Sequence, residues 1–201
     1  MTEPALESSS IGDELELFSL ARNWKDYIFR QIQPYLGERV LENGAGIGTT
    51  LCRSQHRSWV CVEPDATQVT RIQALIDERR LPAFCEATQG RLQADSAYRG
   101  FDAVLYVAVL EHTEDDRAEL LRAAACLAPG GHLVILAPAH QFLFTPFDKR
   151  IGHYRRYDRA SLGRVLPPHG SIVRDRYLDS VGMLASASNR HLLHSGTPSP
   201  G

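Results

Sequence analysis

Short apolar stretches alternate with amphipathic stretches along most of the chain. Runs of strand length, rich in apolar residues, occupy residues 39–42, 59–62, 83–87, 101–107 and 132–136. Between them, apolar residues at helical spacing predict helices over 49–56, 66–80 and 115–127, and a longer amphipathic helix over 15–36 precedes the first strand. Strands that alternate with helices predict an α/β fold, a doubly wound and mostly parallel sheet with helices on both faces.

The two ends of the chain and the part after residue 136 are less regular. Residues 1–12 are polar and rich in serine, so we expect disorder there, followed by one domain over 13–180 and a short helix or flexible tail over 181–201. Residues 137–157 form a predicted loop that is too long for a plain connector, which suggests a functional loop. A helix over 158–166 and a strand over 172–178 are predicted to follow it.

Composition narrows the classes of partner. The chain has 201 residues, 43% of them hydrophobic, and a formal net charge of -2, which gives no global attraction to nucleic acid or to an anionic membrane. No apolar run is long enough to span a bilayer and the N-terminal stretch lacks a signal-peptide core, so we expect a cytoplasmic protein. The widely spaced Cys52, Cys61, Cys85 and Cys126 are interpreted as reduced core thiols.

The first predicted strand runs into a glycine turn, "VLENGAGIG" at residues 40–48. A dinucleotide fingerprint requires a third glycine where Thr49 stands, since Gly48 comes one residue early after Gly44 and Gly46. The turn therefore allows a ligand to approach the backbone, but its glycine pattern does not indicate that the ligand is a pyrophosphate. Taken alone, it is also consistent with a tight connection between a strand and a helix.

Two acidic residues refine the choice of ligand. Glu63 follows the second predicted strand, where a carboxylate can accept hydrogen bonds from both hydroxyls of a ribose. Nicotinamide dinucleotides and S-adenosylmethionine both carry such a ribose. Glu42, at the end of the first strand, would repel a pyrophosphate but would be stabilised beside an ammonium group. The pair favours a cofactor with a positively charged end.

Four segments, in their order and spacing, resemble the motifs of the class I S-adenosylmethionine-dependent methyltransferases: "VLENGAGIG", "VEPD", "FDAVLYVAVLEHTEDD" and "LAPGGHLVILAP". The segment "PAHQFLFTPFDKRIGHYRRYDRASL" is similar to its counterpart in a bacterial subgroup described as type 11 or type 12 methyltransferases. The resemblance covers about residues 15–180. It implies a Rossmann-like sheet, S-adenosyl-L-methionine as cofactor, and methyl transfer to a small-molecule acceptor by in-line displacement.

The resemblance also implies roles for the matching positions. The cofactor would lie against Glu42, Gly44, Ala45, Gly46, Glu63, Pro64, Gly90, Arg91, Leu92, Val107 and Ala108. Three departures stand out. Asn43 replaces an apolar residue, and we expect its side chain to bond backbone near the cofactor; Ala108 replaces a common Asp; and only one of the two final strands of the family fold is predicted.

Candidates for chemistry come from the loops. His112, His140 and His153 are candidate catalytic bases, since histidine titrates near neutrality, although a loop histidine is often structural, and His153 with Asp148 can fix the long loop. No metal is expected, because the acids at 114–116 are better explained as the start of a helix.

Side chains for the acceptor are predicted in two places. Arg155 and Arg156, beside Tyr154 and Tyr157, can form a clamp for an acidic acceptor, or they can pair with nearby acids of the protein. Trp24 and Tyr27 can cover the cofactor as part of a lid, or belong to the core. Two other functions are kept as alternatives, a non-catalytic methyltransferase-like binding module and an NAD-dependent oxidoreductase.

Overall fold

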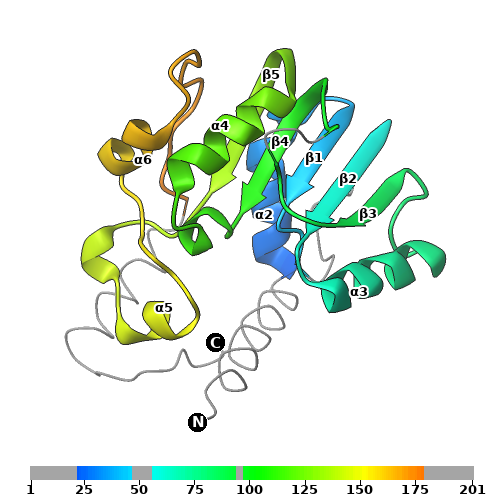
Figure 1. Cartoon of the computed structure of the whole chain (residues 1–201), viewed down its shortest axis with the longest axis horizontal. Coiled ribbons are helices and arrows are strands. Elements are labelled where there is room, and N and C mark those ends of the chain that lie inside the picture. The colour runs from blue at the N-terminus through cyan, green and yellow to red at the C-terminus, as the bar shows by residue number, and fades with distance from the viewer. Residues whose placement is uncertain (1–21, 47–55, 94–96, 179–201) are drawn as a thin grey trace.

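The computed structural model describes residues 22–46, 56–93 and 97–178. Its centre is a sheet of five parallel strands in the order β3-β2-β1-β4-β5 (Figure 1). The strands are β1 (Arg39–Asn43), β2 (Ser58–Glu63), β3 (Cys85–Gln89), β4 (Phe101–Val107) and β5 (Leu127–Leu136). The predicted α/β fold is confirmed. Because the strand order reverses between β1 and β4, ligands are expected at the carboxyl ends of these two strands.

Helices cover both faces of the sheet, α2 behind it and α4 in front of it in Figure 1. Ile28 of α2 (Arg22–Ile32) and Ile72 of α3 (Ala66–Asp77) are buried in one core cluster. Leu120 of α4 (Asp116–Cys126) is buried in the other, with Leu162 of α6 (Arg159–Val165) packed against it. The helices bury their apolar stripes against the apolar strands, which is the arrangement that the alternating pattern predicts.

Strand β1 sends its side chains alternately into these two clusters. Val40 lies in the cluster with α2 and Leu41 in the cluster with α4. The alternation along a strand places Glu42 on the α2 side and Asn43 on the α4 side. Two adjacent polar residues at the end of one strand thus enter different environments.

Most predicted boundaries agree within two residues, and the exceptions have local causes. Helix α3 ends at Asp77 rather than near residue 80, and Arg79 then has a positive φ of 57°. Strand β5 begins at Leu127 and includes the "APGG" stretch, because the pairing with β4 shifts between Phe101 and Ala103. The helix predicted over 49–56 falls almost entirely on residues 47–55, outside the described part of the chain.

The strand predicted over 172–178 is wrong. Residues 171–178 have no regular secondary structure, and Ile172 and Val173 are 62% and 64% exposed, so no apolar burial drives them into the sheet. Arg174 and Arg176 instead donate hydrogen bonds to Gln31 of α2. In the described part of the chain, β5 is therefore an edge of the sheet.

The predicted loop over 137–157 contains two short helices, η3 (Gln141–Leu143) and α5 (Pro146–Arg150). The last residues of this segment, 151–157, we call the strap. The strap returns to the sheet, where the Tyr154 N–H donates to the Glu111 carbonyl at 2.8 Å and Ala139 forms a bridge with Tyr157.

The described cysteines agree with the thiol interpretation. Cys61, Cys85 and Cys126 are buried thiols that form no disulfide within the described ranges, and Cys52 lies outside them. None of the helices within the described ranges has both the length and the apolar character that a membrane span requires.

Candidate cofactor and active site

The glycine turn after β1 packs against the loop that follows β4. Gly44 has a φ of +71°, and a Cβ at this position would lie 2.5 Å from Val109 Cγ2. Its N–H donates to the Val62 carbonyl at 2.8 Å, which anchors the turn to β2. Only glycine combines this backbone conformation with so close a neighbour. The turn is therefore positioned from both sides at the point where the strand order reverses.

Glu63 at the end of β2 holds the same turn. One carboxylate oxygen accepts the Gly46 N–H at 2.9 Å, and the other accepts the Asp65 N–H at 3.1 Å. Burial raises the pKa of Glu63, against the effect of these two hydrogen bonds. A carboxylate has about four acceptor positions, so two remain for hydroxyl donors of a ligand. Carboxylate and glycine turn form one unit, as a ribose-binding site requires.

Glu42 is almost fully buried, and its carboxylate accepts a hydrogen bond from Trp59 Nε1 at 2.8 Å. Burial raises the pKa of Glu42 to about 8, with the Trp59 bond acting in the opposite direction. With a pKa of about 8, the side chain is mostly protonated at pH 7. An ammonium group placed beside it would favour the charged form and lower the pKa again.

Among the described residues, Asn43 bonds a side chain instead of the backbone near the cofactor that we expected. Its Nδ2 donates to Glu119 Oε1 at 3.1 Å, and the Tyr106 hydroxyl donates to the same oxygen at 2.8 Å. Arg122 donates to Glu119 Oε2 at 2.7 Å. Strand alternation directs Asn43 away from Glu42 and toward α4, where this buried carboxylate supplies its acceptor. The polar residue is therefore part of the packing between β1, β4 and α4.

The other predicted cofactor positions surround the ends of β1 to β4. Gly90 donates to the Glu63 carbonyl at 3.0 Å, which joins the ends of β2 and β3. Ala108 has an unusual φ of +53°, and its N–H donates to the Leu136 carbonyl at 2.9 Å. A positive φ in a residue with a Cβ is strained and is often found at functional sites. The remaining positions differ in exposure: Ala45 and Leu92 are buried, Val107 is half-buried, and Pro64 and Arg91 are exposed.

Two of the three candidate histidines come together. The rings of His112 and His153 lie 4.5 Å apart, nearly perpendicular, beside the buried Glu111. Burial, followed by the neighbouring His153, lowers the pKa of His112 to about 4. His140 lies apart from them, stacked on Tyr177 with the ring centroids 4.5 Å apart. Glu111 was not among the candidate site residues, although its place directly before His112 at the end of β4 was a usable signal.

The strap histidine is fixed by its neighbours. His153 Nδ1 lies 3.1 Å from Asp148 Oδ1, and Asp148 also accepts hydrogen bonds from Thr145 and from Arg156. Burial acts to raise the pKa of Asp148, but the hydrogen bonds from His153 and Arg156 outweigh this effect and hold that pKa below its usual range. The contact supports the structural alternative for His153, in which it fixes the long loop together with Asp148.

The two strap arginines are engaged by acids of the protein. Arg156 forms a two-pronged pair with Asp148, at 2.7 Å from Nε and 3.0 Å from Nη2. Arg155 donates to Asp116 at 2.8 Å and to the Glu114 carbonyl at 2.8 Å. Tyr157, nearly buried, donates to Asp116 as well. These contacts agree with the alternative in which both arginines pair with acids of the protein. In this structure the two arginines do not form the predicted clamp for an acidic acceptor.

Trp24 and Tyr27 pack on each other with ring centroids 5.6 Å apart. Trp24 is half-buried against the core cluster on the α2 side, and the Tyr27 hydroxyl donates to the Leu178 carbonyl at 3.3 Å. The packing thus favours the interpretation of Trp24 as a core residue over its interpretation as part of a lid.

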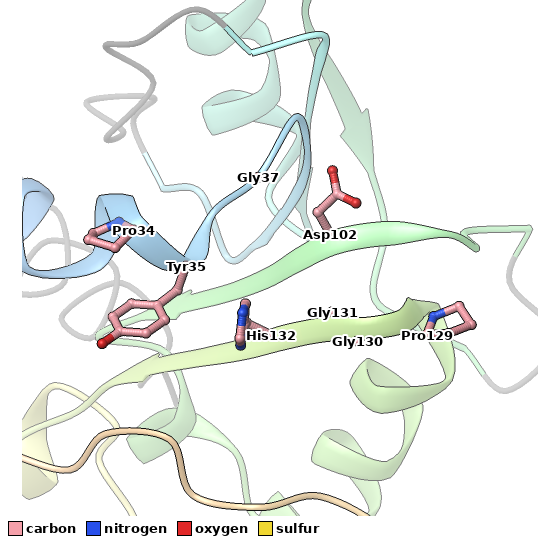
Figure 2. Close-up of a pocket in the computed structure, with 8 residues that line it drawn as sticks. All are labelled: Pro34, Tyr35, Gly37, Asp102, Pro129, Gly130, Gly131 and His132. Carbon is pink, nitrogen blue, oxygen red and sulfur yellow. The ribbon is translucent and has the colours of Figure 1, made fainter.

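A surface hollow of about 260 Å³ lies at the opposite end of the sheet (Figure 2). The hollow is bordered by Gly37 just before β1, by Asp102 near the start of β4, and by Gly130, Gly131 and His132 of β5. Ligands of parallel α/β sheets bind at the carboxyl ends of the strands, so this hollow at the amino ends is not the expected site.

Fold and site geometry together are those of an α/β protein with a candidate nucleotide-binding turn at the switch point of its sheet. The chain matches the family model described as "Methyltransferase domain" over residues 16–181. It therefore belongs to the methyltransferase domain family. No curated protein matches the chain.

Solved structures share the fold at low identity. A putative methyltransferase from Bacillus halodurans is 17% identical, with a TM-score of 0.58, over 68% of this chain and 64% of that one. The [4+2]-cyclase SpnF is 18% identical, with a TM-score of 0.58, over 70% of this chain and 56% of that one. The N-terminal domain of EvdMO1, with SAH bound, is 20% identical, with a TM-score of 0.54, over 71% and 68%.

The chain spans less than two thirds of the Bacillus halodurans protein and of SpnF. At these identities the likeness shows the fold alone. The presence of a cyclase among the neighbours illustrates that one fold can hold different chemistries, so the reaction must be argued from the site.

Proposed function

We propose that the chain binds S-adenosylmethionine at the carboxyl ends of β1 and β2 and transfers its methyl group to a small-molecule acceptor. The observation that carries this proposal is the carboxylate of Glu63, which is tied to the Gly46 N–H and keeps acceptor positions for a ribose. The family match supports methyl transfer over the nicotinamide alternative.

The residues present fit this cofactor. Gly44 and Gly46 both have positive φ and expose backbone rather than side chains, so a ligand can lie directly on the turn. The methionine end would rest there with its ammonium near Glu42, and the adenine would lie between Pro64 and the backbone of residues 90–92. Val107, Ala108 and Ala45 would complete the lining.

Glu42 gives the cofactor preference a physical basis. Its raised pKa of about 8 reflects a carboxylate that burial removes from water. The ammonium of S-adenosylmethionine would supply a compensating charge, whereas a pyrophosphate would add repulsion. Binding of the methionine end should therefore release a proton from Glu42 near neutral pH.

The reaction asks little covalent chemistry of the protein. S-adenosylmethionine supplies a methyl group on a sulfonium, which is a strong electrophile. The chain has to align the acceptor with the sulfur–methyl bond and exclude water. The strap, bonded to Glu111 and Asp116, lies at the carboxyl end of β4 where it can perform both tasks.

The nature of the acceptor is only partly constrained. Since Arg155 and Arg156 are occupied by Asp116 and Asp148, an acidic acceptor gains no support from them. We therefore propose a small-molecule acceptor without assigning its charge. The role of His140 as a base stays a prediction, to be tested once an acceptor is in hand.

Calorimetric titration with S-adenosylmethionine, S-adenosylhomocysteine and NAD tests the proposal. We expect binding of the first two and not of NAD. Glu63→Gln should weaken binding by about tenfold to a hundredfold, the value of hydrogen bonds to a charged group. Glu86→Gln, on the exposed side of β3, is the matched control and should bind as the parent chain does. Binding of NAD alone would overturn the proposal, and so would a folded chain that binds neither sulfur compound.

A further inference from the structure

Three potential metal ligands converge where β4 meets the strap. Glu111 and His112 belong to η2 (Leu110–His112), directly after β4, and His153 comes from the strap. One ligand atom from each of the three lies within 4.8 Å of the others. Glu111 and His112 are adjacent, but His153 is far from them in sequence, so only the fold brings the two elements together.

The orientation of His153 is that of a prepared ligand. Its Nδ1 faces Asp148 Oδ1 at 3.1 Å, so Nδ1 carries the proton and Nε2 offers a lone pair on the other side of the ring. Asp148 is itself fixed by Thr145 and Arg156. A carboxylate that holds the far nitrogen of a histidine is the usual support of a metal-bound imidazole.

The free nitrogen of His153 points into the cluster. The residue is only 8% exposed, and Nε2 has no hydrogen-bond partner among the residues that the structure describes. Glu111 Oε1 lies 4.0 Å from it, beyond hydrogen-bond distance. A buried nitrogen that accepts no hydrogen bond has lost its interaction with water and gained nothing in its place. A bound cation would supply the missing interaction.

We propose that Glu111, His112 and His153 bind one divalent transition-metal ion, with Zn²⁺ as the best-suited example. Two imidazoles and one carboxylate are a known ligand set for such ions and are too nitrogen-rich for Mg²⁺. Bonds of roughly 2.0–2.2 Å would draw the ligand atoms to about 3–3.5 Å from one another, which requires small side-chain rotations from the present geometry.

The ion would add a further link between two elements that the hydrogen bond from the Tyr154 N–H to the Glu111 carbonyl already joins. It would attach the strap to η2, just after the carboxyl end of β4. It would also bind the imidazoles of His112 and His153, two of the three histidines that the sequence offers as candidate bases. The site goes beyond the proposed function, because methyl transfer from a sulfonium needs no metal and the family match assigns none.

Metal titrations of the full chain test the site. After treatment with a chelator, the chain is titrated with Zn²⁺ by calorimetry and with Co²⁺ by visible absorption, with Mg²⁺ as the comparison. We expect about one Zn²⁺ per chain, weak or no Mg²⁺ binding, a Co²⁺ spectrum of nitrogen and oxygen ligands, and a higher Tm with Zn²⁺ because the ion binds only the folded chain.

Variants assign the ligands. His112→Gln and Glu111→Gln should each lower Zn²⁺ affinity by tenfold or more. His140→Gln changes a loop histidine outside the cluster and should leave the affinity unchanged. His112 is only partly buried, so its variant keeps the test valid if Glu111→Gln does not fold, as circular dichroism would report. Unchanged affinity in folded His112→Gln, or absence of stoichiometric binding, would overturn the site. A near-ultraviolet Co²⁺–thiolate band would overturn it too.

These titrations contain no S-adenosylmethionine, and cofactor binding is measured on the metal-free chain. The metal site and the proposed function can therefore fail independently.

Discussion

The buried carboxyl of Glu42 should make the stability of the chain fall as pH rises. Its pKa is raised from 4.5 to about 8 because burial disfavours the charged form. Between these two values the folded chain holds a proton that the unfolded chain has lost, so the free energy of unfolding decreases with pH and levels off above about 8. Glu42→Gln keeps an acceptor for Trp59 Nε1 and removes the ionisation.

The expected magnitude follows from the size of the change in pKa. At about 1.4 kcal/mol for each pKa unit, the wild-type chain should lose roughly 3 kcal/mol at pH 7 relative to pH 4, and somewhat more at pH 9. Glu42→Gln should lack this loss. The variant should therefore match the parent near pH 4.5 and exceed it in stability by several kcal/mol at pH 8.

Urea unfolding followed by tryptophan fluorescence, at several pH values from 4.5 to 9, measures this difference. His112, whose pKa is lowered to about 4, contributes with the opposite sign below pH 6.5. It is present in both proteins, so their difference isolates Glu42. Glu86→Gln controls for the loss of an exposed carboxylate. Parallel pH profiles for the parent and Glu42→Gln would refute the assignment.

Three further substitutions test the packing around the site. Gly44→Ala should lower the free energy of unfolding by at least about 2 kcal/mol and weaken cofactor binding, because a Cβ would meet Val109. Gly130 has a similar φ but open space around it, so Gly130→Ala should lower the free energy of unfolding by only about 1 kcal/mol, measured by denaturant unfolding, and leave cofactor binding unchanged. Glu119→Leu should destabilise by about 2–3 kcal/mol by stranding its buried donors, so an unchanged urea midpoint would contradict the network. Trp24→Ala should cost about 2 kcal/mol without changing cofactor affinity, and a large loss of affinity would restore the lid.

The sheet was predictable because its signals are local. Strands such as Phe101–Val107 are short and mainly apolar. Helices such as α4 begin at an acidic cap, here Asp115, whose side chain accepts the Ala118 N–H. The glycine turn and Glu63 were also evident, since their places follow directly from the strand ends.

What the sequence could not predict depends on contacts between distant residues. The acceptor of Asn43 is Glu119, which is 76 residues away in sequence. The run at 172–178 has the composition of a strand, but it lies outside the sheet, and its two arginines bond Gln31 of α2. The cluster of Glu111 with His153 likewise exists only after the strap folds back onto η2.

A crystal structure of the chain with S-adenosylhomocysteine tests the central claim most directly. The account predicts the ribose hydroxyls within hydrogen-bond distance of the Glu63 carboxylate, with the amino-acid end over Gly44 and Gly46 and its ammonium beside Glu42. A ligand bound at the amino ends of the strands, or one that makes no contact with Glu63, would contradict it.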